Sequence, residues 1–356
     1  MNESILYVCR TYYNIYATII RVLAKKEKAD LLIDDYRRRN LPELTELILN
    51  LKQAGVFKHI YYYHAVGVET VGTNGDGDDV KLHISHENAL LGIPLSLIND
   101  KNYQAIIVYN DWDGEVGDYL RKTHLHYTLS ESSVNAFRIM HKTTPRAAKF
   151  YSTLDNDIYK DESPLGRSRF CDRIEVSSVD GVPSYVKQKS KIINIQGMLE
   201  NLDKEQKEII KEIFLNNTEL IERIKEPGEK VLLLTRPYVG SDRWLPSMEV
   251  QGKLLTDVIN DYAKDSLVFI KPHPRDRFDY STLEVLGNVE LFPRCFPVEV
   301  LNLLECNCFD AVVSVGEECL SSLSISSDTI YLDLSWFREV RKKYCTEEEL
   351  MELNQF

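Results

Sequence analysis

The chain has 356 residues, with 43 Lys and Arg against 55 Asp and Glu, so its formal net charge is −12. At about 150 residues per domain this length predicts two domains, and the 44% of hydrophobic residues can supply two cores. The acidic balance argues against a general nucleic-acid binder, and no apolar run approaches the roughly 18–20 residues of a membrane span.

Short apolar runs alternate with segments of helical periodicity through the first half of the chain. The runs predict strands at Ile5–Cys9, Asp30–Ile33, His59–Tyr63, Ala105–Tyr109 and His126–Leu129. The spacing of apolar residues predicts helices at Thr11–Ala24 and Leu41–Ala54. This alternation is typical of α/β proteins with parallel sheets.

The middle of the chain is more polar and leads into a second α/β run. Strands are predicted at Arg173–Val176 and Ile192–Ile195, followed by one amphipathic helix at Leu202–Ile224. Beyond it we expect strands at Val231–Leu234, Ser266–Ile270, Val289–Phe292, Ala311–Ser314 and Thr329–Leu332, and helices at Leu254–Ala263 and Val298–Leu304. The sequence therefore predicts two Rossmann-like domains facing a central cleft: residues 1–185 and 186–334, with a C-terminal helix at 335–356 packing back at the domain junction.

The strongest local motif is the turn that follows the predicted strand Ser266–Ile270. It reads Lys271-Pro272-His273-Pro274-Arg275, and the two prolines prevent the strand from continuing. An imidazole therefore lies between two cations at the carboxyl end of a strand, where open α/β sheets bind ligands. This arrangement suits an anionic phosphate, to which His273 can donate a hydrogen bond or a proton. The alternative is a solvated turn in which the histidine only caps the strand.

The same motif carries a family resemblance. Lys271–Asp276 resembles the HP motif of bacterial sialyltransferases with the GT-B fold, particularly glycosyltransferase family 52 of lipooligosaccharide and capsule synthesis. Upstream, Leu234–Pro237 with Ser241-Asp242 is similar to the LTQPL-x-ED stretch of that family. Downstream, Phe296–Glu299 and Phe309–Ser314 are similar to its P-x-E and serine motifs. The likeness keeps order and spacing from about residue 231 to 325.

The resemblance implies an inverting, metal-independent enzyme that moves sialic acid from CMP-sialic acid to a galactose-containing acceptor. It implies no cofactor beyond the nucleotide-sugar donor. By resemblance, His273 faces the CMP phosphate and Glu299 binds the ribose hydroxyls. The other substrate contacts that we expect are Lys271, Pro274, Arg275, Arg236, Ser314, Ser321, Ser322, Arg10 and Tyr12.

The general base has three candidates. Asp242 corresponds to the acid of the LTQPL-x-ED stretch and is preferred; a loop aspartate that caps the next turn is the alternative. Glu131, in Leu129–Ser133, lies where the family has an acidic pair followed by glycine, and this chain keeps one of the two acids and lacks the glycine. Asp113, which precedes Gly114, is the third candidate.

A different reading starts from Asp111-Trp112-Asp113, which follows the predicted strand Ala105–Tyr109. An apolar strand followed by Asp-x-Asp is how GT-A glycosyltransferases hold Mn²⁺ or Mg²⁺ against a nucleotide diphosphate. This metal-dependent enzyme remains an alternative, although a second α/β run is not needed by it. Two further alternatives are the same GT-B fold with another donor, such as a UDP-sugar, and a non-catalytic nucleotide-sugar or glycan-binding protein.

The expected location is the cytoplasm, at the inner face of the membrane. Arg10 interrupts the apolar run Ile5–Cys9 where the apolar region of a secretion signal would continue. The segment Ser335–Tyr344 combines aromatic and basic residues, which suits peripheral contact with an anionic membrane. The expected partners are the nucleotide sugar and a glycan acceptor, without nucleic acid, and a homodimer is left open.

Overall fold

The structure is a computed structural model of the chain. It describes residues 4–34, 44–63, 91–92, 95, 98–99, 102–112, 115–134, 136–137, 164–239, 244–304, 306–315 and 323–354. These residues fall into two compact units that meet in the chain at 213/214. The sequence placed this boundary at 185/186. Residues 186–213 belong to the first unit instead, because the strand Ser190–Ile192 pairs with the sheet of that unit.

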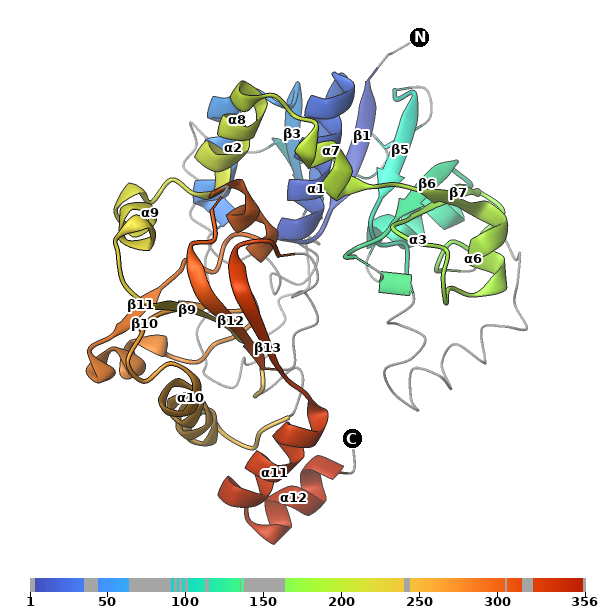
Figure 1. The fold of residues 1–356 in the computed structure, drawn as a ribbon. Coiled ribbons are helices and arrows are strands. Elements are labelled where there is room, and N and C mark those ends of the chain that lie inside the picture. The colour runs from blue at the N-terminus through green and yellow to red at the C-terminus, as the bar shows by residue number, and fades with distance from the viewer. Residues whose placement is uncertain are drawn as a thin grey trace. The chain divides into compact units, whose positions relative to one another are not determined.

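A parallel sheet of eight strands forms the first unit (Figure 1). The strands are β1 (Ile5–Cys9), β2 (Ala29–Asp34), β3 (His59–Tyr63), β4 (Leu91–Gly92), β5 (Ala105–Val108), β6 (Tyr127–Ser130), β7 (Cys171–Val176) and β8 (Ser190–Ile192). Their order is β4-β3-β2-β1-β5-β6-β7-β8. The chain builds outward from β1 to β4 and then returns to the other side of β1 with β5. The carboxyl ends of β1 and β5 therefore flank a topological switch point, where such sheets bind ligands.

The central strands of this sheet, β2, β1, β5 and β6, are largely apolar and buried. Leu6 and Val8 of β1, Val108 of β5 and Ile174 of β7 are at most 2% exposed. Continuous apolar strands of this kind are typical of parallel sheets, and each fully buried aliphatic side chain contributes about 1.5–3 kcal/mol. The helices of the unit are α1 (Tyr12–Lys25), α2 (Leu44–Ala54), α3 (Glu115–Lys122), α6 (Ser184–Lys189), α7 (Ile195–Glu200) and α8 (Lys204–Phe214).

The second unit is built on a smaller parallel sheet. Its strands are β9 (Lys230–Leu234), β10 (Leu267–Lys271), β11 (Val289–Leu291), β12 (Phe309–Val315) and β13 (Ser326–Leu332), in the order β11-β10-β9-β12-β13. Leu234 at the end of β9 pairs with Lys271 of β10 on one side and with Ser314 of β12 on the other. The three strand ends therefore share one edge of the sheet, around a second switch point.

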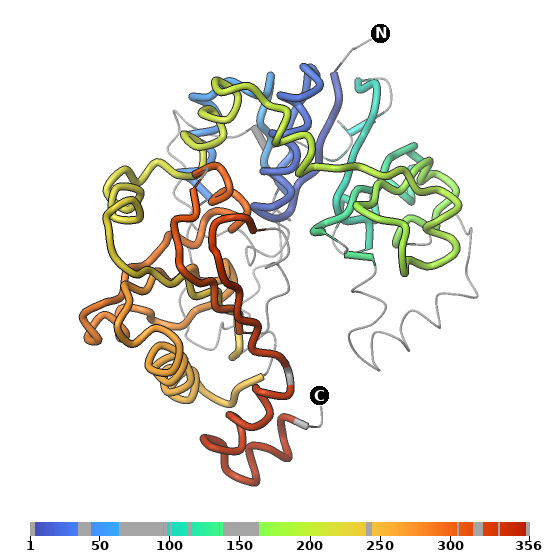
Figure 2. Tube along the Cα trace, in the orientation of Figure 1, coloured from blue at the N-terminus to red at the C-terminus, as the bar shows by residue number. Residues whose placement is uncertain are grey.

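Four α-helices and two 3₁₀-helices complete the described part of the second unit. They are α9 (Thr218–Lys225), α10 (Met248–Tyr262), η4 (Tyr280–Leu286), η5 (Val298–Leu304), α11 (Leu334–Tyr344) and α12 (Glu347–Asn354). Figure 2 traces the chain from α9, in yellow, to α12, in red. Lys343 and Tyr344 of α11 both contact Asp257 of α10. The C-terminal helix predicted at the domain junction is thus two helices, and these contacts hold the first of them within the second unit.

Several predicted elements differ from the structure: the helix predicted at Leu254–Ala263 spans Met248–Tyr262, and the one at Val298–Leu304 is a 3₁₀-helix. The single helix expected at Leu202–Ile224 is broken into α8 and α9, because the side chain of Asn217 accepts a hydrogen bond from the backbone N–H of Leu220 at 3.0 Å and begins a new helix. The strand expected at Ile192–Ile195 is β8, which ends at Ile192, and Asn194 caps α7. No helix in the part of the chain that the structure describes combines the length and apolarity that a membrane span requires.

Candidate functional site

The edge of the second sheet gathers most of the predicted anion-binding residues. Thr235 and Arg236 follow β9, His273 to Arg275 follow β10, and Ser314 lies near the end of β12. The backbone N–H of Thr235 donates to the carbonyl of Lys271 at 3.4 Å, so the first two loops leave the sheet together. The strand order β10-β9-β12 therefore brings together residues that are far apart in the sequence, such as Arg236 and Ser314, which are 78 positions apart.

A tight turn holds the His273 side chain in one arrangement. The backbone N–H of Asp276 donates to the carbonyl of His273 at 2.9 Å, which closes a turn with Pro274 at its second position. The backbone N–H of Arg275 donates to Nδ1 of the imidazole at 3.0 Å. Because Nδ1 accepts this bond, the proton of the neutral ring is on Nε2. The imidazole therefore keeps Nε2–H as its donor.

The surroundings of His273 keep the imidazole neutral. Burial lowers the pKa of His273 well below its ordinary value, and the positive charges of Arg275, Lys271 and Arg236 lower it further. A ring that is difficult to protonate and lies among cations is suited to bind an anion. An anionic group bound here would be stabilised by the cations and would raise the pKa of His273.

The cations of this cluster are held in different ways. Lys271 is only 5% exposed, and its ammonium donates to the carbonyl of Pro272 at 2.8 Å and to that of Arg294 at 3.4 Å. Arg236 stacks on Trp244, with its guanidinium carbon 4.4 Å from the ring centroid. Arg275 is exposed. Lys271 thus anchors the base of the loop, whereas the two arginines lie nearer to solvent.

The remaining predicted contacts of the second unit divide into two groups. Ser314 is fully buried within β12, and Glu299 is partly buried at the second position of η5, which is a 3₁₀-helix. Asp242, Ser321 and Ser322 lie outside the described residues, as does Asp113 of the first unit.

In the first unit, Arg10 and Tyr12 follow β1 at the switch point. The Arg10 Nε lies 3.3 Å from Oδ2 of Asp34, the last residue of β2, and both side chains are under 10% exposed. Tyr12, the first residue of α1, is 2% exposed. The Thr11 hydroxyl and the Asn14 side chain form a capping box, and the Asn14 side-chain amide donates to the carbonyl of Ser132 at 2.9 Å. The first turn of α1 is therefore bonded to the loop after β6.

Glu131, one of the three candidate bases, is engaged within the fold. Its carboxylate accepts hydrogen bonds from the backbone N–H and the hydroxyl of Ser177, at 2.6 and 2.7 Å, and from the N–H of Phe137 at 3.4 Å. It is 7% exposed. These bonds join the end of β6 to the end of β7.

The Asp111 carboxylate is also fully bonded within the first unit. It is fully buried, and its carboxylate accepts from the Tyr127 hydroxyl at 2.7 Å and from the N–H groups of Leu165 and Gly166, both at 2.8 Å. Burial raises the pKa of Asp111, and these hydrogen bonds act against that rise. Among the described residues no cluster of three His, Cys, Asp or Glu side chains is arranged to hold a metal. Asp111 therefore anchors the segment around residue 165.

We expect Asp111→Asn to lower the free energy of unfolding by about 2 kcal/mol, because the amide group of asparagine cannot accept from all three donors. Urea denaturation measures this change. Asp180→Asn, at an exposed position, is the matched control and should change stability by less than about 0.5 kcal/mol. Equal stability of the two variants would remove the anchoring role.

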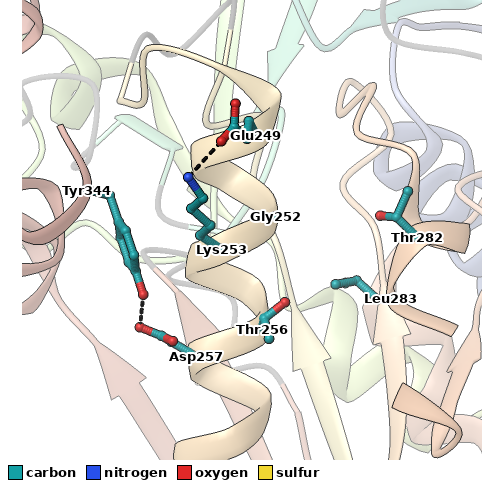
Figure 3. Close-up of a pocket in the computed structure, with 8 residues that line it drawn as sticks. All are labelled: Glu249, Gly252, Lys253, Thr256, Asp257, Thr282, Leu283 and Tyr344. Carbon is teal, nitrogen blue, oxygen red and sulfur yellow. Dashed lines mark hydrogen bonds and ion pairs between the residues drawn. The ribbon is translucent and has the colours of Figure 1, made fainter. Parts of the chain in front are cut away.

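A groove of about 370 Å³ lies elsewhere on the second unit, along α10. Figure 3 shows Lys253 bonded to Glu249 along α10, and Tyr344 of α11 bonded to Asp257 of α10. Since the charged groups that line it are bonded to one another or to α11, we place the candidate site at the edge of the sheet.

Two parallel sheets in separate α/β units, each with candidate residues at its strand ends, define the GT-B fold. Solved structures agree. An α/β-galactoside α-2,3-sialyltransferase from Photobacterium phosphoreum matches with a TM-score of 0.54 at 13% identity, over 98% of both chains. The GT-B domain of a Photobacterium damselae sialyltransferase gives 0.51 at 11% identity, over 97% of this chain and 98% of that one. A UDP-GlcNAc 2-epimerase from Neisseria meningitidis gives 0.53 at 12% identity, over 98% and 92%.

A match between the sequence and a family model identifies the family. The model of glycosyltransferase family 52 matches residues 96–314, and the chain belongs to this family. An uncharacterized protein of Haemophilus influenzae is 31% identical over 133 residues, which cover 37% of this chain and 41% of that relative. The chain thus belongs to a glycosyltransferase family and has the GT-B fold. The GT-A alternative built on Asp111 and Asp113 is wrong, because that class does not have this pair of parallel sheets.

Sequence reasoning missed several residues that bond to the candidate site residues or to their neighbours. Asp34 holds Arg10, and the side chains of Gln251 and Tyr280 both bond to Asp276. Asp276 closes the recognised motif, and Asp34 ends an apolar strand, so both were visible as acids beside the site. Their partners were not visible, because Gln251 is 25 residues from Asp276 along the chain.

Proposed function

We propose that this protein is an inverting, metal-independent sialyltransferase that moves sialic acid from CMP-sialic acid to a galactose-containing acceptor of a bacterial surface glycan. The observation that carries the proposal is the neutral His273 with its Nε2–H available, among Lys271, Arg275 and Arg236. A CMP-sugar has a single phosphate and sialic acid adds a carboxylate, so both charges suit this cluster. Membership in family 52 and the fold shared with sialyltransferases support the same substrate class.

In the proposed reaction, the acceptor hydroxyl attacks the anomeric carbon of sialic acid while the bond to the CMP phosphate breaks. Negative charge grows on the departing phosphate oxygen, and the Nε2–H of His273 donates to it. The arginines stabilise the same charge by their field. Glu299 binds the ribose hydroxyls, and Ser314, Ser321 and Ser322 contribute hydroxyl groups on the phosphate side.

The proton of the acceptor hydroxyl passes to a carboxylate on the opposite side of the sugar. Asp242 remains our first candidate, with Asp113 and Glu131 in reserve. Glu131 would have to release its hydrogen bonds from Ser177 in order to act. Asp242→Asn should therefore abolish transfer, and full activity of this variant would move the role to one of the other two. We propose that Arg10 and Tyr12 contribute on the acceptor side.

A UDP-sugar donor is the second candidate, and one comparison favours it. The epimerase with the same fold was solved with UDP-GlcNAc bound. Family 52 and the single-phosphate argument rank it behind CMP-sialic acid. Calorimetric titration with CMP and with UDP separates the two, since we expect the tighter binding for CMP and the reverse order would favour the alternative.

The binding of CMP should depend on pH through His273. In the free protein the pKa of His273 is depressed, and the bound phosphate raises it, so binding takes up a proton as pH falls through the pKa that His273 has in the complex. Affinity attributable to His273 should therefore rise as the pH is lowered through that pKa. The same titration of His273→Gln corrects for protonation of the phosphate itself. Identical pH dependence in both proteins would show that the phosphate does not bind beside His273.

We propose a cytoplasmic location with peripheral contact at the inner face of the membrane. The support is the basic composition of α11, which carries Arg338, Arg341, Lys342 and Lys343, although Lys343 is ion-paired with Asp257 of α10. Co-sedimentation with anionic vesicles tests the contact, and its absence at low salt would rule it out. A homodimer remains a proposal for size-exclusion chromatography with light scattering.

A further inference from the structure

A buried network of polar side chains lies directly behind the His273 turn. The Asp276 carboxylate is its centre: Oδ2 accepts from the Gln251 side-chain amide at 2.9 Å and from the Tyr280 hydroxyl at 2.5 Å, and Oδ1 accepts from the N–H of Phe278 at 3.0 Å. The Tyr280 and Thr235 hydroxyl oxygens are 2.5 Å apart. Since Tyr280 donates to Asp276, Thr235 donates to Tyr280.

The network has no contact with bulk water. Gln251, Asp276, Thr235 and Tyr280 are each at most 3% exposed. A buried carboxylate is costly unless its hydrogen bonds are complete, so its neighbours are held to one arrangement. An apolar cluster of the same shape would stabilise the fold as well. The cost of burying this carboxylate therefore indicates a role other than stability.

The same four residues connect three elements around the site. Thr235 begins the loop after β9, which carries Arg236, and Asp276 ends the turn that contains His273. The backbone N–H of Asp276 closes that turn on the His273 carbonyl at 2.9 Å. Gln251 belongs to α10, a helix capped by Ser247 and packed in the core. The network therefore ties both strand-end loops to a rigid helix.

We propose that Asp276, with Gln251, Tyr280 and Thr235, is a positioning device that fixes the His273 turn relative to the loop after β9, so that the imidazole and Arg236 address one bound phosphate. This inference rests on the proposed role of His273. Asp276 acts through hydrogen-bond geometry: it does not touch the substrate. Its charge is also dispensable, since an amide at this position can be accommodated.

The network itself shows how the amide is accommodated. Among the described residues, the side-chain carbonyl Oε1 of Gln251 is buried and has no hydrogen-bond partner. In Asp276→Asn, a flipped Gln251 amide accepts from the new NH₂ group through this oxygen. The Tyr280 and Thr235 hydroxyls can reverse their direction as well. Asp276→Asn should therefore keep the turn in place, whereas Asp276→Ala should release it.

The test is a double-mutant cycle on donor turnover. We expect Asp276→Ala to lower kcat about 10- to 100-fold, the cost of a misplaced catalytic group, with Asp276→Asn within about threefold of the native protein. In a His273→Ala background, Asp276→Ala should have less than about a twofold further effect, because the group it positions is gone. Tyr280→Phe should lower kcat and also lose its effect in that background. Asp257 lines the groove along α10 and is outside the network (Figure 3), so Asp257→Ala is the control and should leave kcat unchanged.

Each outcome has a definite meaning. An equal loss in both backgrounds, or a loss in Asp276→Asn as large as in Asp276→Ala, overturns the positioning role. Where Asp276→Ala does not fold, Tyr280→Phe carries the cycle. If His273→Ala is fully active, the proposed function fails. The positioning role of the network is then tested by ¹⁵N NMR, which reports the tautomer of His273. There, the Nε2–H tautomer of His273 should persist in Asp276→Asn and be lost in Asp276→Ala, and no change in either spectrum would refute the inference independently of turnover.

Discussion

Alanine in place of His273 is expected to lower transfer from CMP-sialic acid by about 10²- to 10⁴-fold, the usual contribution of a positioned acid or hydrogen-bond donor. The substitution removes the imidazole whose Nε2–H donates a hydrogen bond to the departing phosphate, and it leaves Lys271, Arg275 and Arg236 in place. CMP should therefore still bind, with its affinity reduced far less than kcat. Steady-state kinetics and calorimetry on the same preparation measure the two effects.

A second histidine provides the matched control for this result. His126 is 60% exposed, and its Nδ1 lies 2.7 Å from a carboxylate oxygen of Asp172. His126→Ala should leave both kcat and KM unchanged. Undiminished turnover by His273→Ala, or an equal loss in His126→Ala, would remove His273 from the mechanism and leave the turn with a structural role.

The second large effect concerns stability. Arg21 of α1 and Glu175 of β7 form an ion pair with 2.6 Å between Nη1 and Oε2, and their side chains are 1% and 4% exposed. Arg21 also donates to the Ser130 hydroxyl at 3.3 Å and lies over the Tyr7 ring at 5.2 Å. Arg21→Met removes the buried partner of this carboxylate and leaves it only the partly exposed Arg173, 3.3 Å away, so we expect it to lower the free energy of unfolding by about 3 kcal/mol, the lower end of the cost of breaking a buried pair.

An exposed ion pair of the same length tests this reasoning. Arg223 and Glu290 of the second unit are also 2.6 Å apart but are 42% and 32% exposed. Arg223→Met should cost less than about 1 kcal/mol, because solvent screens the charges. Urea denaturation followed by tryptophan fluorescence and circular dichroism gives both values. Similar costs for the two pairs would show that burial does not determine the strength of the Arg21 pair.

The fold was predictable from the sequence wherever strands are covered on both faces. Ile5–Cys9 has the predicted bounds, and Val231–Leu234 differs by one residue from β9. A buried parallel strand must be apolar throughout, so it contrasts with its polar surroundings. The helix expected at Leu202–Ile224 is polar on both sides of the point where it breaks. Asn217 can lie on a helix surface or cap a new helix, so the sequence does not show the break.

The site was predictable where the chain itself makes the geometry. The prolines on either side of His273 stop a strand, and a parallel sheet puts its strand ends on one edge, so the cluster followed from local sequence and fold class. Asp111 shows the limit of this reasoning. Its partners Leu165 and Gly166 are 54 and 55 residues away, and only the folded chain shows that they bind its carboxylate.

The central proposal is tested most directly by turnover of purified protein with a panel of nucleotide-sugar donors and a galactoside acceptor, with and without EDTA. We expect CMP-sialic acid to be consumed, with release of CMP, at a rate that EDTA does not change and that His273→Ala reduces. Consumption of a UDP-sugar in place of CMP-sialic acid, or loss of activity in EDTA, would contradict a metal-independent sialyltransferase.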